Sequence, residues 1–154
     1  DDWLRRWPVQ NYVELTKLLI KSGYKVIVTG DKSDEYIREK FAGMNVEIII
    51  GETDIPGLIK IFSHASCIIT HDSGPFHLAS LSGSNVIGLF GPVNPSERIP
   101  LNNPLINYLW NGKNLACCPC YDGKNYAKCN NNKCLGSITV LNVFEKIEIV
   151  LKKK

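Results

Sequence analysis

The stretch His71–His77 (HDSGPFH) brings two imidazoles, a carboxylate and a hydroxyl together around one glycine. Gly74 permits a tight turn in which the backbone approaches a ligand closely. The hydroxyl of Ser73 and the free amides of a helix start attract an anion, and His77 can reach a phosphate from the first turn. Asp72 has the opposite charge, so its natural partner is a hydroxyl or a cation. This combination predicts a site for a sugar attached to a phosphate. The alternative is that the Asp-Ser pair only caps a helix.

A second group of chemistry-bearing side chains is a cysteine cluster. Five of the six cysteines fall within eighteen residues: Cys117, Cys118, Cys120, Cys129 and Cys134. Four of these thiols could reach one tetrahedral ion, although structural zinc usually has paired C-x₂₋₄-C spacings and a C-x-C spacing fits less well. Disulfides are a second interpretation, which a reducing cytosol would oppose. Reduced thiols tied to packing are the third, and all three stay open.

Composition limits the class of protein. The chain has 154 residues, of which 44% are apolar and 21% charged, as expected for one folded globular domain rather than a disordered or fibrous chain. Apolar stretches are far shorter than the ~18 residues that a membrane span needs, and no secretory signal opens the chain. The net charge of +3 is too small to indicate nucleic-acid binding.

The charge is unevenly distributed. The window Asn102–Cys134 holds four lysines and one aspartate, so it carries the whole +3, and the remaining residues balance at 14 against 14. We therefore expect a neutral body with an Asn- and Cys-rich insert over about 102–136, followed by a C-terminal helix over about 138–152.

Helical and strand patterns alternate along the body. The predicted helices are Val9–Ser22, Ser33–Phe41, Ile55–Ser63, Pro75–Ser82 and Ile138–Lys152, and the predicted strands are Lys25–Thr29, Val46–Ile50, Cys67–Thr70 and Val86–Phe90. Strands that are apolar throughout and separated by helices predict a doubly wound parallel α/β sheet of the Rossmann-like type. Ligands of such sheets bind beyond the carboxyl ends of the strands. The loops expected there are Gly30–Asp34, Gly51–Asp54, Thr70–His77 and Phe90–Pro100.

Four segments carry a family resemblance, of which Val26–Gly30 resembles a strand and glycine turn of the family described next. Residues 71–100, HDSGPFHLASLSGSNVIGLFGPVNPSERIP, are similar to the D-S/T-G-x-x-H-L-A…FGPT-x-P signature of the family 9 glycosyltransferases, the heptosyltransferases of lipopolysaccharide assembly. Arg5-Arg6-Trp7-Pro8 resembles the K/R-x-W-P that opens the C-terminal domain of that family. The Cys117–Cys134 segment followed by Ile138 resembles its cysteine-containing tail.

The resemblance implies a GT-B enzyme with two Rossmann-like domains, in which the C-terminal domain binds most of the nucleotide-sugar donor. Ser73, Gly74 and His77 would hold the donor diphosphate. Asp72 would hydrogen-bond the donor sugar, and Arg5 would replace the basic residue beside the phosphates. These last two are the expected catalytic residues.

The nucleoside end of the donor is implied to lie at neighbouring loops. Asp34 would lie near the ribose, with Gly30 as the glycine turn beside it, and Thr53 would line the base pocket. The chain departs from the family pattern at Val93, where threonine is usual, and at Arg5, where lysine is replaced by a forked guanidinium. The resemblance also implies a central strand before Trp7 and an N-terminal acceptor domain, neither of which this sequence contains.

We therefore expect the donor-binding part of a two-domain glycosyltransferase that does not transfer sugar alone. The full enzyme would move heptose or a related sugar from an ADP- or similar nucleotide sugar to a lipid-linked saccharide acceptor of the lipopolysaccharide-core type. No cofactor is expected, apart from a structural zinc at the cysteine cluster as one alternative. The expected location is cytoplasmic, with at most peripheral membrane contact through Lys152–Lys154. The alternatives are a non-catalytic nucleotide-binding module and a GT-B-shaped nucleotide-sugar epimerase.

Overall fold

The computed structural model describes residues 2–100 and 102–152, so Lys153 and Lys154 lie outside the described residues. The strands are β1 (Ile27–Gly30), β2 (Glu47–Ile50), β3 (Cys67–His71), β4 (Asn85–Phe90) and β5 (Ile106–Trp110). The α-helices are α1 (Val9–Lys21), α2 (Ile55–His64), α3 (Gly74–Ser80), α4 (Lys133–Gly136) and α5 (Val140–Lys152). Four 3₁₀ helices complete the order: η1 (Asp2–Arg5), η2 (Lys32–Phe41), η3 (Pro95–Glu97) and η4 (Gly112–Asn114).

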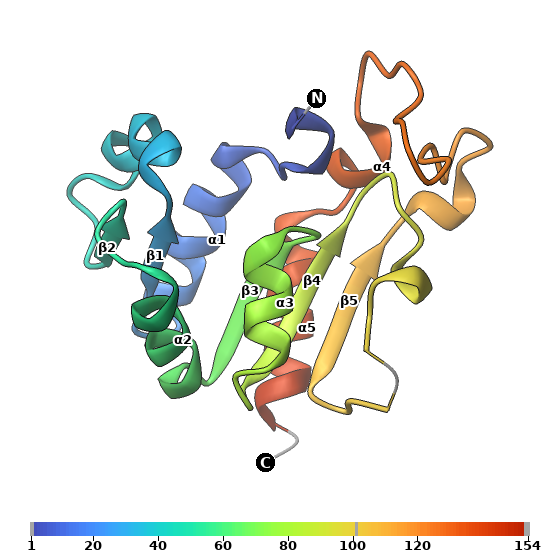
Figure 1. Cartoon of the computed structure of the whole chain (residues 1–154). Helices are drawn as coiled ribbons and strands as arrows, with labels where there is room; N and C mark the ends of the chain where they lie inside the picture. The colour runs from blue at the N-terminus through green and yellow to red at the C-terminus, as the bar shows by residue number, and fades with distance from the viewer. Residues whose placement is uncertain (1, 101, 153–154) are drawn as a thin grey trace.

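All strand pairs are parallel, as predicted. β1 pairs with β2, and β4 lies between β3 and β5. Within the described chain these are two separate sheets, because no hydrogen bonds join β1 to β3. Each of these two strands keeps one unpaired edge facing the other sheet (Figure 1). The central strand that the family resemblance implies would lie between these edges, and it stays a prediction.

Both faces of the larger sheet are covered, which explains the apolar strands. Successive side chains of a strand point to opposite faces. Ile87 and Leu89 of β4 pack in one core with residues of α1 and α5, whereas Val86 and Phe90 pack in a second core with α2 and α3. Figure 1 shows α3 on the near side of β3 and β4, and α5 behind them. The prediction of a doubly wound α/β architecture is confirmed.

The structure adds the strand β5 and the short helix α4 and changes one helix relative to the sequence pattern. The strand β5 lies inside the stretch 102–136 that was expected to be an insert outside the body, and it pairs along its length with β4. The segment predicted as the helix Ser33–Phe41 is the 3₁₀ helix η2. The cysteine-containing part of the insert is tied to the body, because Cys134 and Leu135 are buried. None of the described helices is long and apolar enough to cross a membrane.

Candidate functional site

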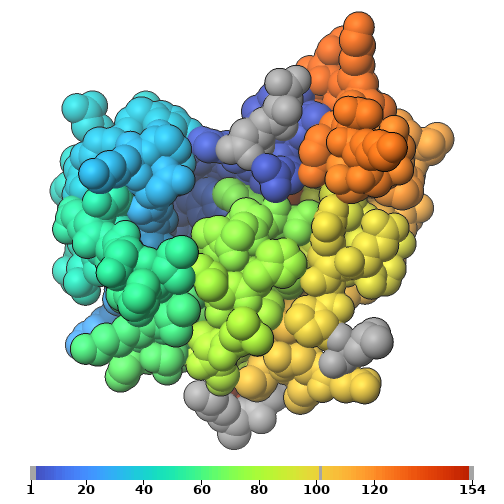
Figure 2. Space-filling view, in the orientation of Figure 1, coloured from blue at the N-terminus to red at the C-terminus, as the bar shows by residue number. Residues whose placement is uncertain are grey.

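The loops predicted to bind a ligand lie at one edge of the two sheets. The strands are parallel within each sheet, and the arrows of both sheets point the same way in Figure 1, so the segments that follow β1, β2, β3 and β4 lie at the same edge. Figure 2 shows a hollow on this side of the molecule, between η2 in light blue, the N-terminal segment in dark blue and the beginning of α3 in green. This hollow is open to solvent.

Asp72 forms the centre of the site. It follows β3 directly and is only 8% exposed. Its main-chain oxygen accepts a hydrogen bond of 3.4 Å from Nη1 of Arg5, and its Oδ2 lies 3.9 Å from Nε of Arg98. A carboxylate that is largely removed from water needs a positive partner, and two guanidinium groups provide positive charge around this residue.

The residues that follow Asp72 make no side-chain cap of the helix α3. Ser73 occupies the N-cap position of α3, but its hydroxyl donates to the main-chain oxygen of His71 at 3.3 Å and makes no cap hydrogen bond. The capping alternative is therefore wrong for Ser73. A Cβ on Gly74 would meet nothing within 4 Å, so the surface at this glycine is open. His77 is exposed, with its ring edge-on to Phe76 at 5.6 Å.

The residues predicted for the nucleoside end lie on the smaller sheet. Asp34 accepts a hydrogen bond of 3.2 Å from the main-chain nitrogen of Asp31 in a reciprocal capping box, and it forms an ion pair of 3.4 Å with Arg6. A Cβ on Gly30 would lie 3.0 Å from the Asp34 side chain, which explains the glycine at the end of β1. Thr53 is half-buried in the loop after β2.

Asp31 illustrates how firmly the start of η2 is held. Its Oδ1 accepts from the main-chain nitrogen of Ser33 at 2.6 Å. The hydrogen bonds from Ser33 lower the pKa of the Asp31 carboxyl, because they stabilise its charged form. The position of Asp34 is therefore fixed by two independent contacts, the capping box and the ion pair with Arg6.

Two adjacent arginines join the two sheets across the hollow. Arg5 contacts Asp72 after β3, and Arg6 contacts both Asp34 and the hydroxyl of Tyr36, at 3.0 Å, on η2. The side chains of consecutive residues thus reach the loops of both sheets. The sequence motif pointed to this segment, but sequence reasoning assigned a role to Arg5 alone.

Arg98 is the second residue that the sequence analysis missed. It lies inside the loop Phe90–Pro100, which was predicted to face the ligand, but no motif position indicated a role for it. Its contact with Asp72 depends on the parallel pairing of β3 and β4, which places their two loops side by side.

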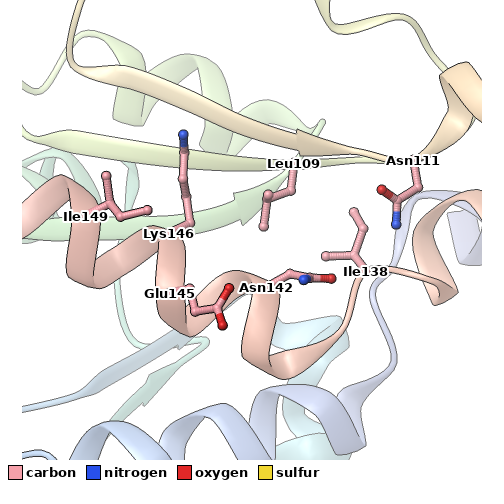
Figure 3. Close-up of a pocket in the computed structure, with 7 residues that line it drawn as sticks. All are labelled: Leu109, Asn111, Ile138, Asn142, Glu145, Lys146 and Ile149. Atoms are coloured by element: carbon pink, nitrogen blue, oxygen red, sulfur yellow. The ribbon is translucent and has the colours of Figure 1, made fainter.

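A groove elsewhere on the molecule has a volume of about 310 Å³ and lies between β5 and α5. Figure 3 shows Leu109 of β5 and the side chains of Lys146 and Ile149 of α5 along it. None of the residues predicted for the donor lines this groove or a second one, of about 570 Å³, beside Ser96, Ile99 and Tyr108. The candidate site rests instead on the contacts around Asp72.

The cysteine cluster consists of free thiols. In residues 2–100 and 102–152, no three or more His, Cys, Asp or Glu side chains are arranged to hold a metal ion. Burial raises the pKa of the Cys118 thiol to about 12, and it also raises the pKa of the Cys120 and Cys134 thiols. Cys118, Cys120 and Cys134 are at least partly buried, as the packing interpretation expects, and the structural-zinc alternative stays a prediction.

The parallel strands, the two covered sheet faces and the polar site at the strand ends define a Rossmann-like α/β protein. The comparison with known families then identifies it further. The family model "Glycosyltransferase family 9 (heptosyltransferase)" matches residues 4–130, and the chain belongs to this family. The sequence-based resemblance is thereby confirmed.

Individual relatives agree with this assignment. Lipopolysaccharide heptosyltransferase 2 of Escherichia coli K12 is 33% identical over 106 residues, which are 64% of this chain and 30% of the relative. The solved E. coli ADP-heptose lps heptosyltransferase II has a TM-score of 0.77 and 26% identity, over 97% of this chain and 43% of that one. The family 9 glycosyl transferase of Veillonella parvula has the same fold, with a TM-score of 0.76 at 23% identity, over 98% of this chain and 43% of that one. The chain spans about a third of the length of the curated relatives that it matches.

Proposed function

We propose that this chain binds the nucleotide-sugar donor of a glycosyltransferase. The observation that carries the proposal is the buried carboxylate of Asp72 with Arg5 and Arg98 beside it, at the end of β3 and next to the open surface at Gly74. A guanidinium suits a diphosphate, and a carboxylate beside it can accept a hydrogen bond from a sugar hydroxyl. These two functions match the two ends of the bond that a glycosyltransferase breaks.

In the proposed reaction the bond between the anomeric carbon of the sugar and the diphosphate oxygen breaks. Its electron pair remains on the diphosphate, while the oxygen of an acceptor hydroxyl forms the new bond to the sugar. The proton of that hydroxyl passes to a general base, which we propose lies in the part of the full-length relatives that this chain does not match. Arg5 stabilises the negative charge that grows on this leaving group, because a fixed guanidinium stabilises the transition state without reorganisation. Asp72 orients the sugar, and Ser73 and His77 contact the phosphates.

The donor and acceptor follow from the relatives by analogy. One solved relative is an ADP-heptose lps heptosyltransferase, and a curated one is a lipopolysaccharide heptosyltransferase. We therefore propose heptose or a related sugar on ADP as the donor and a lipopolysaccharide-core saccharide as the acceptor. The acceptor would bind to the part of the full-length relatives that this chain does not match. A cytoplasmic location at the inner face of the membrane remains a prediction.

Calorimetric titration of the chain with ADP- and UDP-sugars tests the proposal. We expect binding of the ADP-sugar, and a loss of about tenfold or more in affinity for Asp72→Ala, because the carboxylate contacts the sugar. His77→Ala should weaken binding less, since its imidazole is exposed. His64→Ala, an exposed histidine on α2, is the matched control and should bind normally.

Two outcomes would contradict the site. One is that neither nucleotide sugar binds to the chain. The other is that the Asp72 and His77 variants both bind like the original protein. A full-length protein that carries this domain, binds the nucleotide sugar and still leaves the sugar on it when an acceptor is supplied would instead favour the alternative of a non-catalytic module.

A further inference from the structure

The guanidinium of Arg98 lies between the donor loop and the insert. It follows η3, with Nε 3.9 Å from Oδ2 of Asp72. On its other side, its Cζ lies 5.5 Å from the centre of the Tyr121 ring, within the range of a cation–π interaction. Nε is buried and has no hydrogen-bond partner in the described part of the chain. Charge and ring contact therefore hold the Arg98 side chain in place.

Tyr121 belongs to a short hairpin over residues 120–127, here called the insert hairpin. Tyr121 and Tyr126 form an antiparallel bridge, with ring centres 4.8 Å apart. The Tyr121 hydroxyl donates to the main-chain oxygen of Gly123 at 2.9 Å. The turn between the two strands is closed by Asp122, whose side chain accepts from the main-chain nitrogens of Lys124 and Asn125. The Tyr121 ring is thus positioned by local contacts within the hairpin.

The insert hairpin is attached to the same loop that carries Arg98. The main-chain nitrogen of Cys120 donates to the main-chain oxygen of Pro92 at 2.9 Å. Just before it, Trp110 and Cys118 both donate to the main-chain oxygen of Gly91, at 3.1 Å and 3.5 Å. The insert and the loop after β4 therefore form one connected support behind Asp72.

Electrostatics gives this support a consequence for the ligand. A diphosphate bound at Gly74 brings negative charge close to the Asp72 carboxylate, and like charges repel strongly where water is largely excluded. A guanidinium beside that carboxylate offsets the repulsion. It can do so only while its side chain is held at that point.

We propose that Arg98 is a donor-positioning residue and that the insert hairpin sets its position through the Tyr121 ring. This inference rests on the proposed binding of a nucleotide diphosphate at Asp72. Arg98 neutralises Asp72 while the diphosphate is bound, and so raises donor affinity. The insert contributes none of the sequence-predicted donor-binding residues. It thereby raises donor affinity only through the position of Arg98.

The test is calorimetric titration of the chain with ADP, at low and at physiological salt, with melting temperatures to show that each variant folds. Arg98→Gln should weaken ADP binding by about tenfold and reduce its salt dependence. Arg98→Lys keeps the charge and should stay within about threefold of the original protein. Tyr121→Leu should weaken binding by about threefold, and Tyr121→Phe, which keeps the ring, should bind normally.

Two comparisons separate positioning from mere folding. Tyr126→Leu perturbs the same hairpin but leaves the ring beside Arg98, so it should bind ADP better than Tyr121→Leu. In an Arg98→Gln background, Tyr121→Leu should have no further effect, because the cation it positions is gone. Normal ADP binding by Arg98→Gln, equal losses in the two tyrosine-to-leucine variants, or additive losses in the double variant would each overturn the inference. If the unmodified chain binds neither ADP nor a nucleotide sugar, the proposed function itself fails.

Discussion

The two sheets of this molecule differ in how deeply their strands are buried. In β4, the side chains of Val86, Ile87, Leu89 and Phe90 are at most 1% exposed. In β1 and β2 only Ile50 is buried, and Ile27 at the start of β1 is 46% exposed. The larger sheet is therefore the firm part of the fold only through its central strand, because its edge strands β3 and β5 are partly covered, as β1 and β2 are.

This difference divides the proposed donor site. The residues expected to hold the diphosphate and sugar follow β3, on the larger sheet, whereas Asp34 and Thr53, expected at the nucleoside, follow the strands of the smaller sheet. The Arg5–Arg6 pair contacts both sides. The reacting end of the donor would thus rest on the firm sheet, and the nucleoside end on a sheet that local contacts must hold in place.

Replacing matched isoleucines should show the contrast most strongly. Ile87 lies in the centre of β4 and is 0% exposed, and Ile27 begins β1. Ile87→Ala should lower the free energy of unfolding by about 2–5 kcal/mol, because it removes buried methyl groups and leaves a cavity. Ile27→Ala should cost less than about 1 kcal/mol. Urea unfolding followed by circular dichroism measures both, and equal losses would contradict the comparison.

Two strand glycines provide a second matched pair. A Cβ on Gly88 in β4 would lie 2.5 Å from the Phe90 ring and 2.8 Å from the Phe76 ring, whereas a Cβ on Gly30 in β1 would lie 3.0 Å from the Asp34 side chain. Gly88→Ala should therefore destabilise the fold by about 1–3 kcal/mol through overpacking. Gly30→Ala should cost less than Gly88→Ala, because only one side chain has to move. A larger loss of unfolding free energy for Gly30→Ala would show that the smaller sheet is the more rigid one.

The same contrast explains what the sequence could predict. The buried strand β4 reads as an unbroken apolar run, and the loop after β3 is marked by glycine and proline, so both were predictable. The strand β5 was not, because Ile106–Trp110 has a half-buried pattern, contains the 48% exposed Tyr108, and follows asparagines and prolines typical of loops.

The missed site residues have a different cause. Arg98 and Arg6 act through contacts with residues distant in the sequence, Asp72 and Asp34. Such ion pairs depend on which loops the sheet places together, and no local spacing encodes them. The ring of Tyr121 beside Arg98 is equally invisible in the sequence.

Breaking the link between the two sheets should have a moderate effect on ligand binding. Arg6→Gln removes the ion pair with Asp34, so we expect about a two- to fivefold loss of ADP affinity, because the nucleoside side loses one of its attachments. The matched control is Arg38→Gln. Arg38 pairs with Glu35 and Glu52 within the smaller sheet's own loops, and its loss should leave ADP affinity nearly unchanged. An equal loss of ADP affinity in both variants would mean that η2 affects ADP binding only through its own folding.

Chemical labelling of the native cysteines probes the fold without a substitution in either sheet. All six lie between residues 67 and 134, so they report on the larger sheet and its insert. Burial raises the pKa of the Cys67 and Cys118 thiols to about 12, which leaves only about one thiolate in ten thousand at pH 8. The exposed Cys117 should therefore react first with iodoacetamide, as mass spectrometry of the labelled peptides would show.

Labelling at increasing urea then follows the larger sheet alone. We expect Cys67 to react only when β3 unfolds, after the smaller sheet has already become accessible to proteolysis.

Because the folded pKa values of the Cys67 and Cys118 thiols are raised, their contribution to stability is complete below about pH 9 and is lost as the pH rises toward about 12. A decrease in the urea midpoint over that range should follow. Labelling of Cys67 as fast as Cys117 in the native protein would contradict the firmness of the larger sheet. Labelling of Cys118, Cys120 and Cys129 only after a chelator is added would instead support the structural-zinc alternative.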